Sequence, residues 1–175
     1  AVDASAATLG VNLILSNQTE GFTITGSAFN DTITAGSGSD SIDGGAGADS
    51  ITGGVGNDTF VGFLGADTII GGAGTNTIVL AATSTDLNAA VDAQVTTVQA
   101  VDASSAVSGV TITLGLQTEG FTVTGSASGD SIQGGAGADS ISSGLGNDTI
   151  VGFVGADTID GGLDTDTISL TATST

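Results

Sequence analysis

A spacing of nine residues between acidic side chains is the feature that most restricts how this chain can fold. Two places after each acid lies Ile, or Phe at one position, and the residue between them is Ser or Thr. A period of nine with paired glycines indicates a short strand followed by a tight turn. It excludes an amphipathic helix, whose apolar residues recur every three or four positions. The residues in this frame are Asp31, Asp40, Asp49, Asp58, Asp67 and Asn76, then Asp130, Asp139, Asp148, Asp157 and Asp166.

A longer duplication contains this short period. Residues 1–33 match residues 100–132, and QTEGFTITGSA in the first copy becomes QTEGFTVTGSA in the second. Residues 44–51 match residues 134–141 at a smaller offset, so the first copy carries one additional block of nine. We therefore expect the chain to be a segment of a tandem array.

The residue types that the chain lacks argue against several functions. Its 175 residues include no Lys, Arg, His, Cys, Pro, Met, Trp or Tyr, and its formal net charge is −19. Without imidazole, thiol or side-chain amine groups it can form no Ser-His-Asp triad, Cys-His pair or zinc site. Without cationic side chains we expect no binding to nucleic acid, and no apolar run is long enough for membrane insertion. We see no catalytic site and expect a protein that is not an enzyme.

The uncompensated negative charge restricts the fold further. No salt bridge between side chains can form, so a fold that gathers carboxylates would suffer strong like-charge repulsion. Disorder is one alternative, but the mean hydropathy of +0.38 and the regular Ile and Val positions argue against it. The acids either lie far apart on a solvated surface or share a bound cation. Calcium, ahead of magnesium, is the leading hypothesis because both are bound by oxygen atoms and calcium accepts flexible geometry.

The repeats resemble those of a known family. GGAGADSIT, GGVGNDTFV and GGAGADSIS match the nonapeptide G-G-x-G-x-D-x-U-x of RTX calcium-binding proteins. The resemblance implies an all-β fold, a right-handed parallel β-roll in which two nonapeptides form one coil. Turns on one side then stack every eighteen residues, and the Ile residues are buried as a ladder between two parallel sheets.

The resemblance also implies where calcium binds, namely between successive turns on each edge of the roll. Pairing in-frame residues eighteen apart gives about seven sites, and Asn76 weakens the last site of the first block by one charge. All eleven in-frame side chains given above are implied ligands. The implied backbone carbonyl ligands are those of Gly44, Gly53, Gly62, Gly71, Gly134, Gly152 and Gly161.

Two repeats and a connector are expected along the chain. The first repeat spans residues 1–80, with a metal-free lead-in coil at 10–25 and a β-roll at 26–79. The second spans 109–175, with a lead-in coil at 109–124 and a β-roll at 125–169. The ladder positions of the two lead-in coils are expected at Leu15 and Ile24, and at Leu114 and Val123.

The connector, residues 81–108, has two readings. Apolar residues at helical spacing predict a short helix over about 85–94 with Thr85 as its N-cap, followed by a strand. Alternatively the coils continue unbroken, because Asn76 and Asp130 are separated by a multiple of nine residues.

The resemblance implies a structural role: a calcium-stiffened segment of a secreted bacterial surface-layer, filament or adhesin-type protein. Such proteins leave the cell unfolded by type I secretion and fold where calcium is abundant. The alternatives are a ligand- or ice-binding module and the RTX tail of a secreted enzyme or toxin. Apart from calcium, the expected partners are neighbouring repeats or further copies of the chain. The contact would use outward apolar residues, which are Val61, Ile70, Val79 and Val151, with Phe63 and Phe153 beside them.

Overall fold

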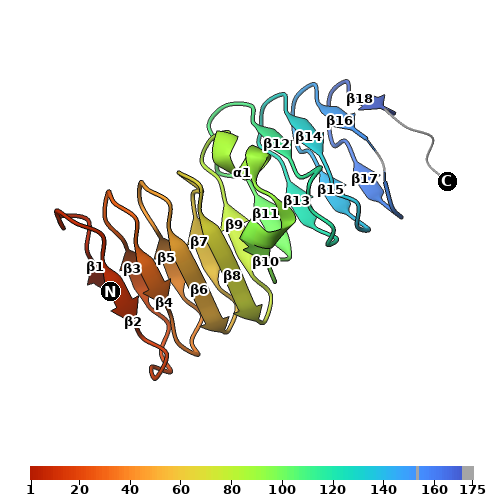
Figure 1. The fold of residues 1–175 in the computed structure, drawn as a ribbon. Helices are drawn as coiled ribbons and strands as arrows, with labels where there is room; N and C mark the ends of the chain where they lie inside the picture. Colours follow the sequence, from red (N-terminus) through yellow and green to blue (C-terminus); the bar gives the residue numbers. More distant parts are fainter. Residues whose placement is uncertain (153, 171–175) are drawn as a thin grey trace. The chain divides into compact units, whose positions relative to one another are not determined.

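The computed structural model describes residues 1–152 and 154–170, which belong to two compact units. The first unit comprises Ala1–Val79 and Asp92–Val98, and the second comprises Leu80–Val91 and the chain from Gln99 onward. The connector is therefore divided between the units instead of forming a part of its own. Figure 1 shows the strands of both units in sequence colours.

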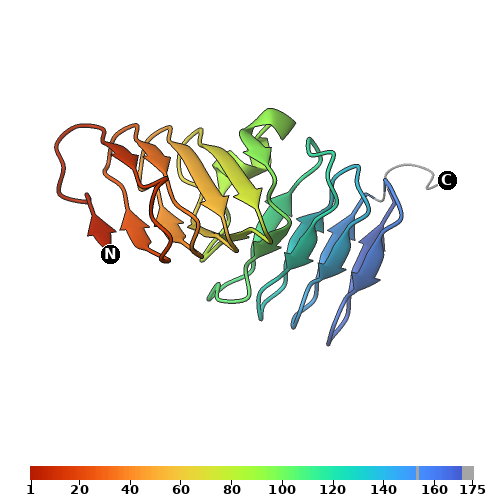
Figure 2. The same ribbon diagram turned by 90° about the horizontal axis from the view of Figure 1, so that it is seen from below.

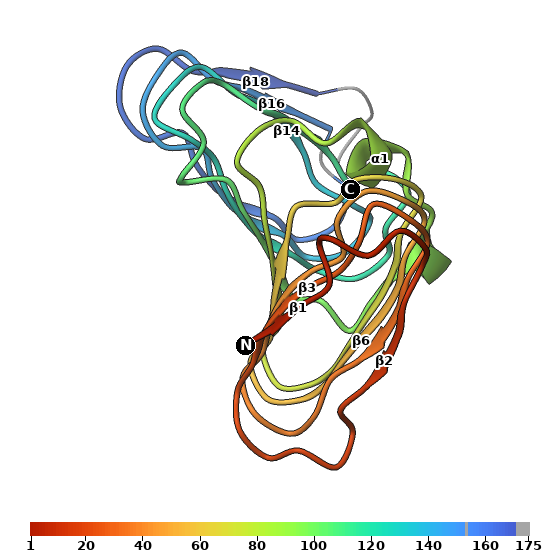
Figure 3. The ribbon, with the colours of Figure 1, turned by 90° about the vertical axis from the view of Figure 1, so that its left-hand side faces the viewer.

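The first unit consists of stacked coils whose strands form two parallel sheets, seen along the stack in Figure 3. In both sheets each strand pairs with the strand of the next coil. One sheet has the order β1 (Val2–Asp3), β3 (Thr23–Thr25), β5 (Ser41–Asp43), β7 (Thr59–Val61) and β9 (Thr77–Val79). The other has the order β2 (Asn12–Ile14), β4 (Thr32–Thr34), β6 (Ser50–Val55), β8 (Thr68–Ala73) and β10 (Val95–Thr96).

The second unit repeats this arrangement, and its coils follow one another in sequence order in Figure 2. One sheet contains β11 (Ala100–Asp102), β13 (Thr122–Thr124), β15 (Ser140–Ser142) and β17 (Thr158–Asp160). The other contains β12 (Thr111–Thr113), β14 (Ser131–Gln133), β16 (Thr149–Val151) and β18 (Thr167–Ser169). The predicted all-β parallel β-roll is confirmed.

The register agrees with the nine-residue frame. Ile33 pairs with Ile51, and Ile51 pairs with Ile69, so equivalent residues lie one coil apart. These side chains are buried between the two sheets, and so are Ile132 and Ile150 of the second unit. The short strands are stable because each coil buries its apolar residue against the coils before and after it.

The lead-in coils differ from the prediction at one ladder position each. Leu13, not Leu15, pairs with Ile33, and Ile112, not Leu114, pairs with Ile132. Ile24 and Val123 occupy the ladder as expected. The turn that follows β2 or β12 has two more residues than a nonapeptide allows, which shifts the frame before that turn.

The connector holds one short helix. Helix α1 spans Thr85–Ala89, and its N-cap is Ser84, whose side chain accepts a hydrogen bond from the Leu87 N–H, so the predicted Thr85 cap was wrong by one residue. A 3-10 turn at Asp92–Gln94 leads into β10. The helix is shorter than the predicted 85–94. In β10, Val95 pairs with Ile69, a spacing that is not a multiple of nine, so the nine-residue frame does not run through the connector.

The outward apolar residues do not form one exposed surface. Val61 and Ile70 are exposed, whereas Val79 and Val151 are partly buried and Phe63 is buried. Phe153 lies outside the described residues. In the part of the chain that the structure describes, no helix is long and apolar enough to cross a membrane.

Neighbouring residues of β8 allow a test of the ladder. Ile69 is 1% exposed and Ile70 is 44% exposed. We expect Ile69→Ala to lower the free energy of unfolding by about 3 kcal/mol, because it leaves a cavity between the sheets. Ile70→Ala should change it by less than about 0.5 kcal/mol. Urea titration in saturating calcium measures both values, and equal losses would contradict the observed inward direction of Ile69.

Candidate metal centre

The in-frame aspartates form a ladder of hydrogen bonds along each edge of a roll. In the first unit, Asp49 Oδ1 accepts the backbone N–H of Asp31 at 2.8 Å, and Asp67 Oδ1 accepts that of Asp49 at 2.9 Å. On the other edge, Asp58 Oδ1 accepts the N–H of Asp40 at 2.9 Å. Each carboxylate therefore joins its own turn to the turn one coil earlier.

The second unit has the same ladder. Asp148 Oδ1 accepts the N–H of Asp130 at 2.8 Å, and Asp157 Oδ1 accepts that of Asp139 at 3.0 Å. Asp166 Oδ1 accepts the N–H of Asp148 at 3.1 Å. Asp157 and Asp166 are partly buried, whereas the other in-frame residues are buried.

The second carboxylate oxygen, Oδ2, is satisfied by the chain itself at the first aspartate of each edge. The donor is the backbone N–H of the second residue in the same turn. The donor–acceptor pairs are Ser27 to Asp31 at 2.6 Å, Gly36 to Asp40 at 3.3 Å, Ser126 to Asp130 at 2.6 Å and Gly135 to Asp139 at 2.8 Å. We name these four the closed turns.

The next turns along three of the edges leave Oδ2 without a partner. The Oδ2 atoms of Asp49, Asp58 and Asp148 are buried and accept no hydrogen bond in the structure. We name these three the open turns. A buried charged oxygen without a partner costs at least about 1–3 kcal/mol, so such an atom calls for a cation or a proton.

Backbone conformation separates the two kinds of turn. The second residue of each open turn is a glycine in the left-handed region, with φ of 94° at Gly45 and 109° at both Gly54 and Gly144. The closed turns have no positive φ at this position, so their N–H can reach the carboxylate. Because left-handed backbone is what demands glycine, Ser27 and Ser126 are tolerated in the closed turns. Phe29 and Ser128 at the fourth position are tolerated for the same reason.

At the first position of several turns only glycine fits without displacing a neighbouring oxygen, although Ala35 and Ser143 occupy this position in two other turns. A Cβ on Gly53 would collide with Asp58 Oδ2 and would lie 2.6 Å from the Gly71 carbonyl oxygen. A Cβ on Gly26 would meet Asp31 Oδ2 and the Gly44 carbonyl in the same way. A carboxylate oxygen and the carbonyl of the next coil thus approach the same glycine, and these are the oxygen types that calcium binds.

Other predicted positions differ from this arrangement. Gly62 and Gly152 have positive φ values of 73° and 65°, and a Cβ on Gly62 would meet nothing within 4 Å. Leu64 donates its N–H to Asp67 Oδ2 at 3.2 Å. Among the described residues, no three acidic side chains gather closely enough to hold a metal by themselves, so backbone oxygens are needed at any such site.

The electrostatics agree with an unmet need for positive charge. Burial raises the pKa of Asp49 to about 6, and the charges of Asp31 and Asp43 add to the effect against the opposing Asp31 N–H. Burial also raises the pKa of Asp58, with Asp40 contributing. The pKa of Asp139 is raised by burial as well, although two backbone N–H groups oppose it.

Asn76 is bonded differently from the aspartates. Its Oδ1 accepts the Asp58 N–H at 2.9 Å, which continues the ladder. Its Nδ2 donates to the carbonyls of Thr97 at 3.0 Å and Gly72 at 3.5 Å. Sequence reasoning missed the role of Thr97, because no motif marks a connector residue that returns to the roll.

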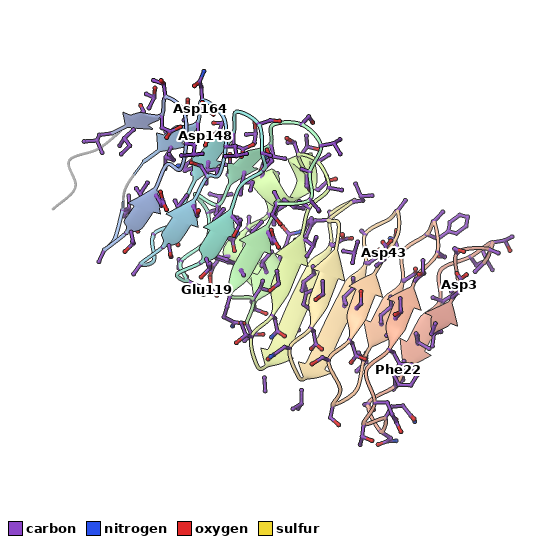
Figure 4. All side chains as sticks on the ribbon, turned by 180° about the vertical axis from the view of Figure 1, so that it is seen from behind. Asp3, Phe22, Asp43, Glu119, Asp148 and Asp164 are labelled. Atoms are coloured by element: carbon purple, nitrogen blue, oxygen red, sulfur yellow. The ribbon has the colours of Figure 1, made fainter. Side chains whose placement is uncertain are left out.

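Two aspartates outside the frame serve the turns. Asp43 Oδ1 accepts the Gly45 N–H at 3.0 Å. Asp164 Oδ2 accepts the Gly146 N–H at 3.2 Å across one coil, and Figure 4 shows Asp148 and Asp164 in this part of the second unit. Glu119, also marked there, has a buried Oε2 without a partner, while Glu20 accepts from the Thr19 N–H at 3.3 Å.

Comparison with known proteins identifies the repeats. The family model for the RTX calcium-binding nonapeptide repeat matches four times, at residues 23–51, 43–78, 122–150 and 139–168. These matches cover more than half of the chain. No curated protein gives a significant match.

Asp164 occupies a position that favours glycine, with φ of 81°, where the equivalent Gly146 has 109°. Asp164→Gly should therefore relieve about 1 kcal/mol of strain in left-handed backbone, which offsets the loss of the hydrogen bond from the Gly146 N–H to Asp164 Oδ2 and leaves the free energy of unfolding nearly unchanged. Ser128→Gly is the matched control, since this fourth position lies in a closed turn without positive φ. The control should be neutral or slightly destabilising. Thermal unfolding in saturating calcium compares the two, and a destabilisation by Asp164→Gly of more than the roughly 1 kcal/mol of one hydrogen bond would contradict the strain.

Proposed function

This chain belongs to the family of RTX calcium-binding nonapeptide repeats, and from that premise we propose that its two rolls fold around calcium outside the cell as a structural segment of a bacterial surface protein. The observation that carries the proposal is the set of three buried Oδ2 atoms without partners, at Asp49, Asp58 and Asp148. They fit a calcium-binding repeat because a bound cation would supply the positive charge that a buried carboxylate oxygen without a donor lacks.

We assign calcium first to the open turns. Asp49, Asp58 and Asp148 would each supply Oδ2, and carbonyls such as that of Gly71, which lies near Asp58, would supply further oxygens. Asp67 and Asp166 stand one coil after Asp49 and Asp148 and direct Oδ1 toward those turns. Of the roughly seven sites expected from pairing alone, these three have the strongest support. The closed turns have less need of metal, since their own N–H groups bind the carboxylates.

The role of the residues follows from burial and charge. Folding removes the open-turn carboxylates from water and brings them close to other acids in the same ladder, which opposes the compact state. Bound calcium supplies the positive charge that reverses this penalty. Once the carboxylates are held, each Oδ1 bond joins consecutive coils, so calcium binding and stacking of coils are coupled.

A structural role outside the cell suits this chemistry. Weak oxygen sites fill at the millimolar calcium concentrations found outside cells and stay empty in the cytosol, so the chain would remain unfolded until it is secreted. The absence of His, Cys, Lys and Arg leaves few groups for catalysis. Secretion, a surface-layer, filament or adhesin role and association with neighbouring repeats are parts of this proposal.

One observation favours a second candidate, a binding face on a sheet. Thr32, Ser50 and Thr68 pair in register on neighbouring strands, which gives a row of hydroxyl groups. The neighbouring row contains Thr34 and Thr52 but ends in the apolar Ile70. The regular row supports ligand or ice binding less strongly than the open turns support calcium.

Folding should require calcium. We expect the metal-stripped chain at neutral pH to be mostly disordered by circular dichroism and to gain β signal as calcium is added, because the open-turn carboxylates are otherwise uncompensated. A β-rich metal-free chain at low salt would refute the proposal. Acidification gives a second test of the same carboxylates.

Burial raises the pKa of Asp49 in the folded chain to about 6. Protonation of Asp49 therefore stabilises the fold fully at a pH below the pKa of Asp49 in the unfolded chain, and this stabilisation is lost as the pH rises through 6. The metal-free chain should therefore gain some β signal near pH 4.

Asp58 should matter more for calcium than Asp40. Replacement by Ala removes one Oδ1 hydrogen bond in each case. Asp58 loses the bond from the Asp40 N–H at 2.9 Å, and Asp40 loses the bond from the Phe22 N–H at 2.7 Å. Only Asp58 has an Oδ2 without a partner. Asp58→Ala should therefore reduce the number of bound ions and raise the calcium midpoint of folding several-fold more than Asp40→Ala. Titration calorimetry measures both, and equal effects would contradict the division into open and closed turns.

A further inference from the structure

Asn76 ends one edge of the ladder in the first unit with an amide instead of an acid. Its Oδ1 accepts the Asp58 N–H at 2.9 Å, the bond that links aspartates elsewhere. A Cβ on Gly71 would lie 2.6 Å from Asn76 Nδ2, just as a Cβ on Gly53 would meet Asp58 Oδ2. The amide nitrogen therefore takes the place that the unpartnered carboxylate oxygen has in the open turn before it.

The atoms that face this nitrogen are oxygens. Asn76 Nδ2 donates to the Thr97 carbonyl at 3.0 Å and to the Gly72 carbonyl at 3.5 Å. Carbonyl oxygens only accept hydrogen bonds, so the space between them needs either a donor or a cation. The Asn76 amide supplies the donor and carries no charge.

Thr97 is held in an unusual conformation to present its carbonyl. Its φ is 54°, a region that β-branched residues rarely adopt. Thr97 Oγ1 accepts the Gly72 N–H at 2.7 Å and donates to the Thr96 carbonyl at 2.7 Å. Strain of this kind persists only where the surroundings fix the residue, and it marks positions with a specific task.

We infer that the Asn76 amide replaces a calcium ion, so that the connector residues 95–97 dock on the first unit without metal. The inference rests on the proposed function, because it states that the turn containing Asn76 holds no metal in a roll that otherwise binds calcium. It also predicts a latent site: an aspartate at position 76 would direct a carboxylate oxygen at two carbonyls and would need a cation there. Asp166 of the second unit holds the equivalent position as an acid, with Oδ1 accepting the Asp148 N–H at 3.1 Å.

The test is Asn76→Asp in the whole chain, with calcium as the probe. We expect one more bound calcium ion per chain than in the wild type by titration calorimetry. Hydrogen exchange followed by mass spectrometry should show a second effect. In the wild type, peptide 92–98 should gain protection at the same calcium concentration as the rest of the first unit. In the variant this peptide should need several-fold more calcium, because its docking then depends on an additional ion.

The charge-matched control is Asn147→Asp. Asn147 is exposed, and its Oδ1 also accepts a backbone N–H, that of Thr165 at 3.0 Å. This variant should keep the wild-type ion number. Asn76→Leu, which lacks both polar atoms, should weaken protection of peptide 92–98 without adding an ion, and it keeps the test valid if Asn76→Asp folds poorly. An unchanged ion number in a folded Asn76→Asp chain, or full protection of the peptide in Asn76→Leu, would overturn the inference. A wild type that binds no calcium would instead refute the proposed function.

Discussion

The hydrogen bond from the backbone N–H of one in-frame residue to the Oδ1 of the residue one coil later is the interaction on which the rest of the structure depends. It recurs at 2.8 to 3.1 Å in both units. It sets the eighteen-residue coil, because only an acceptor at this position satisfies the N–H at the end of each turn. It also places every carboxylate inside its turn, where the second oxygen has to find a partner.

The turns fall into two classes according to whether the second carboxylate oxygen, Oδ2, accepts a hydrogen bond. A second residue without positive φ directs its N–H at Oδ2 and satisfies it within the protein, as at Ser27 and Ser126. A left-handed glycine directs the N–H elsewhere and leaves Oδ2 open, as at Asp49 and Asp58. Glycine in this motif therefore leaves a carboxylate oxygen without a backbone donor as well as allowing a sharp turn. The same consensus sequence then gives turns with a satisfied Oδ2 and turns without one, and the proposed function assigns calcium to the latter.

The sequence predicted the regular part of this fold well. A period of nine determines which residues face the core, because Ile two places after each aspartate can be buried only if coils stack. The structure differs from the prediction in the lead-in coils and in the connector, where the nine-residue period is interrupted. Leu13 replaces Leu15 in the ladder because a longer turn shifts the frame, and Ser84 caps α1 in place of Thr85.

The eleven candidate ligand positions could likewise be predicted from their spacing, but their division into open and closed turns could not. That division depends on the φ angle of the second residue in each turn. A glycine at this position does not predict an open turn, because Gly36 and Gly135 stand there in closed turns. Ser27 and Ser126 were the available signal, since a side chain at the second position disfavours left-handed backbone.

The distribution of closed and open turns has a consequence for how such a roll assembles. The closed turns lie first on each edge, so the coil that receives the following ones has its carboxylates satisfied before any metal binds. The open turns come next, where each new coil adds buried charge as well as apolar contact. Under the proposed function, the uncompensated carboxylates of these coils are what opposes growth of the roll without calcium. The proposal thereby places calcium dependence in the coils that follow the first one, and the first coil of each block would act as a template.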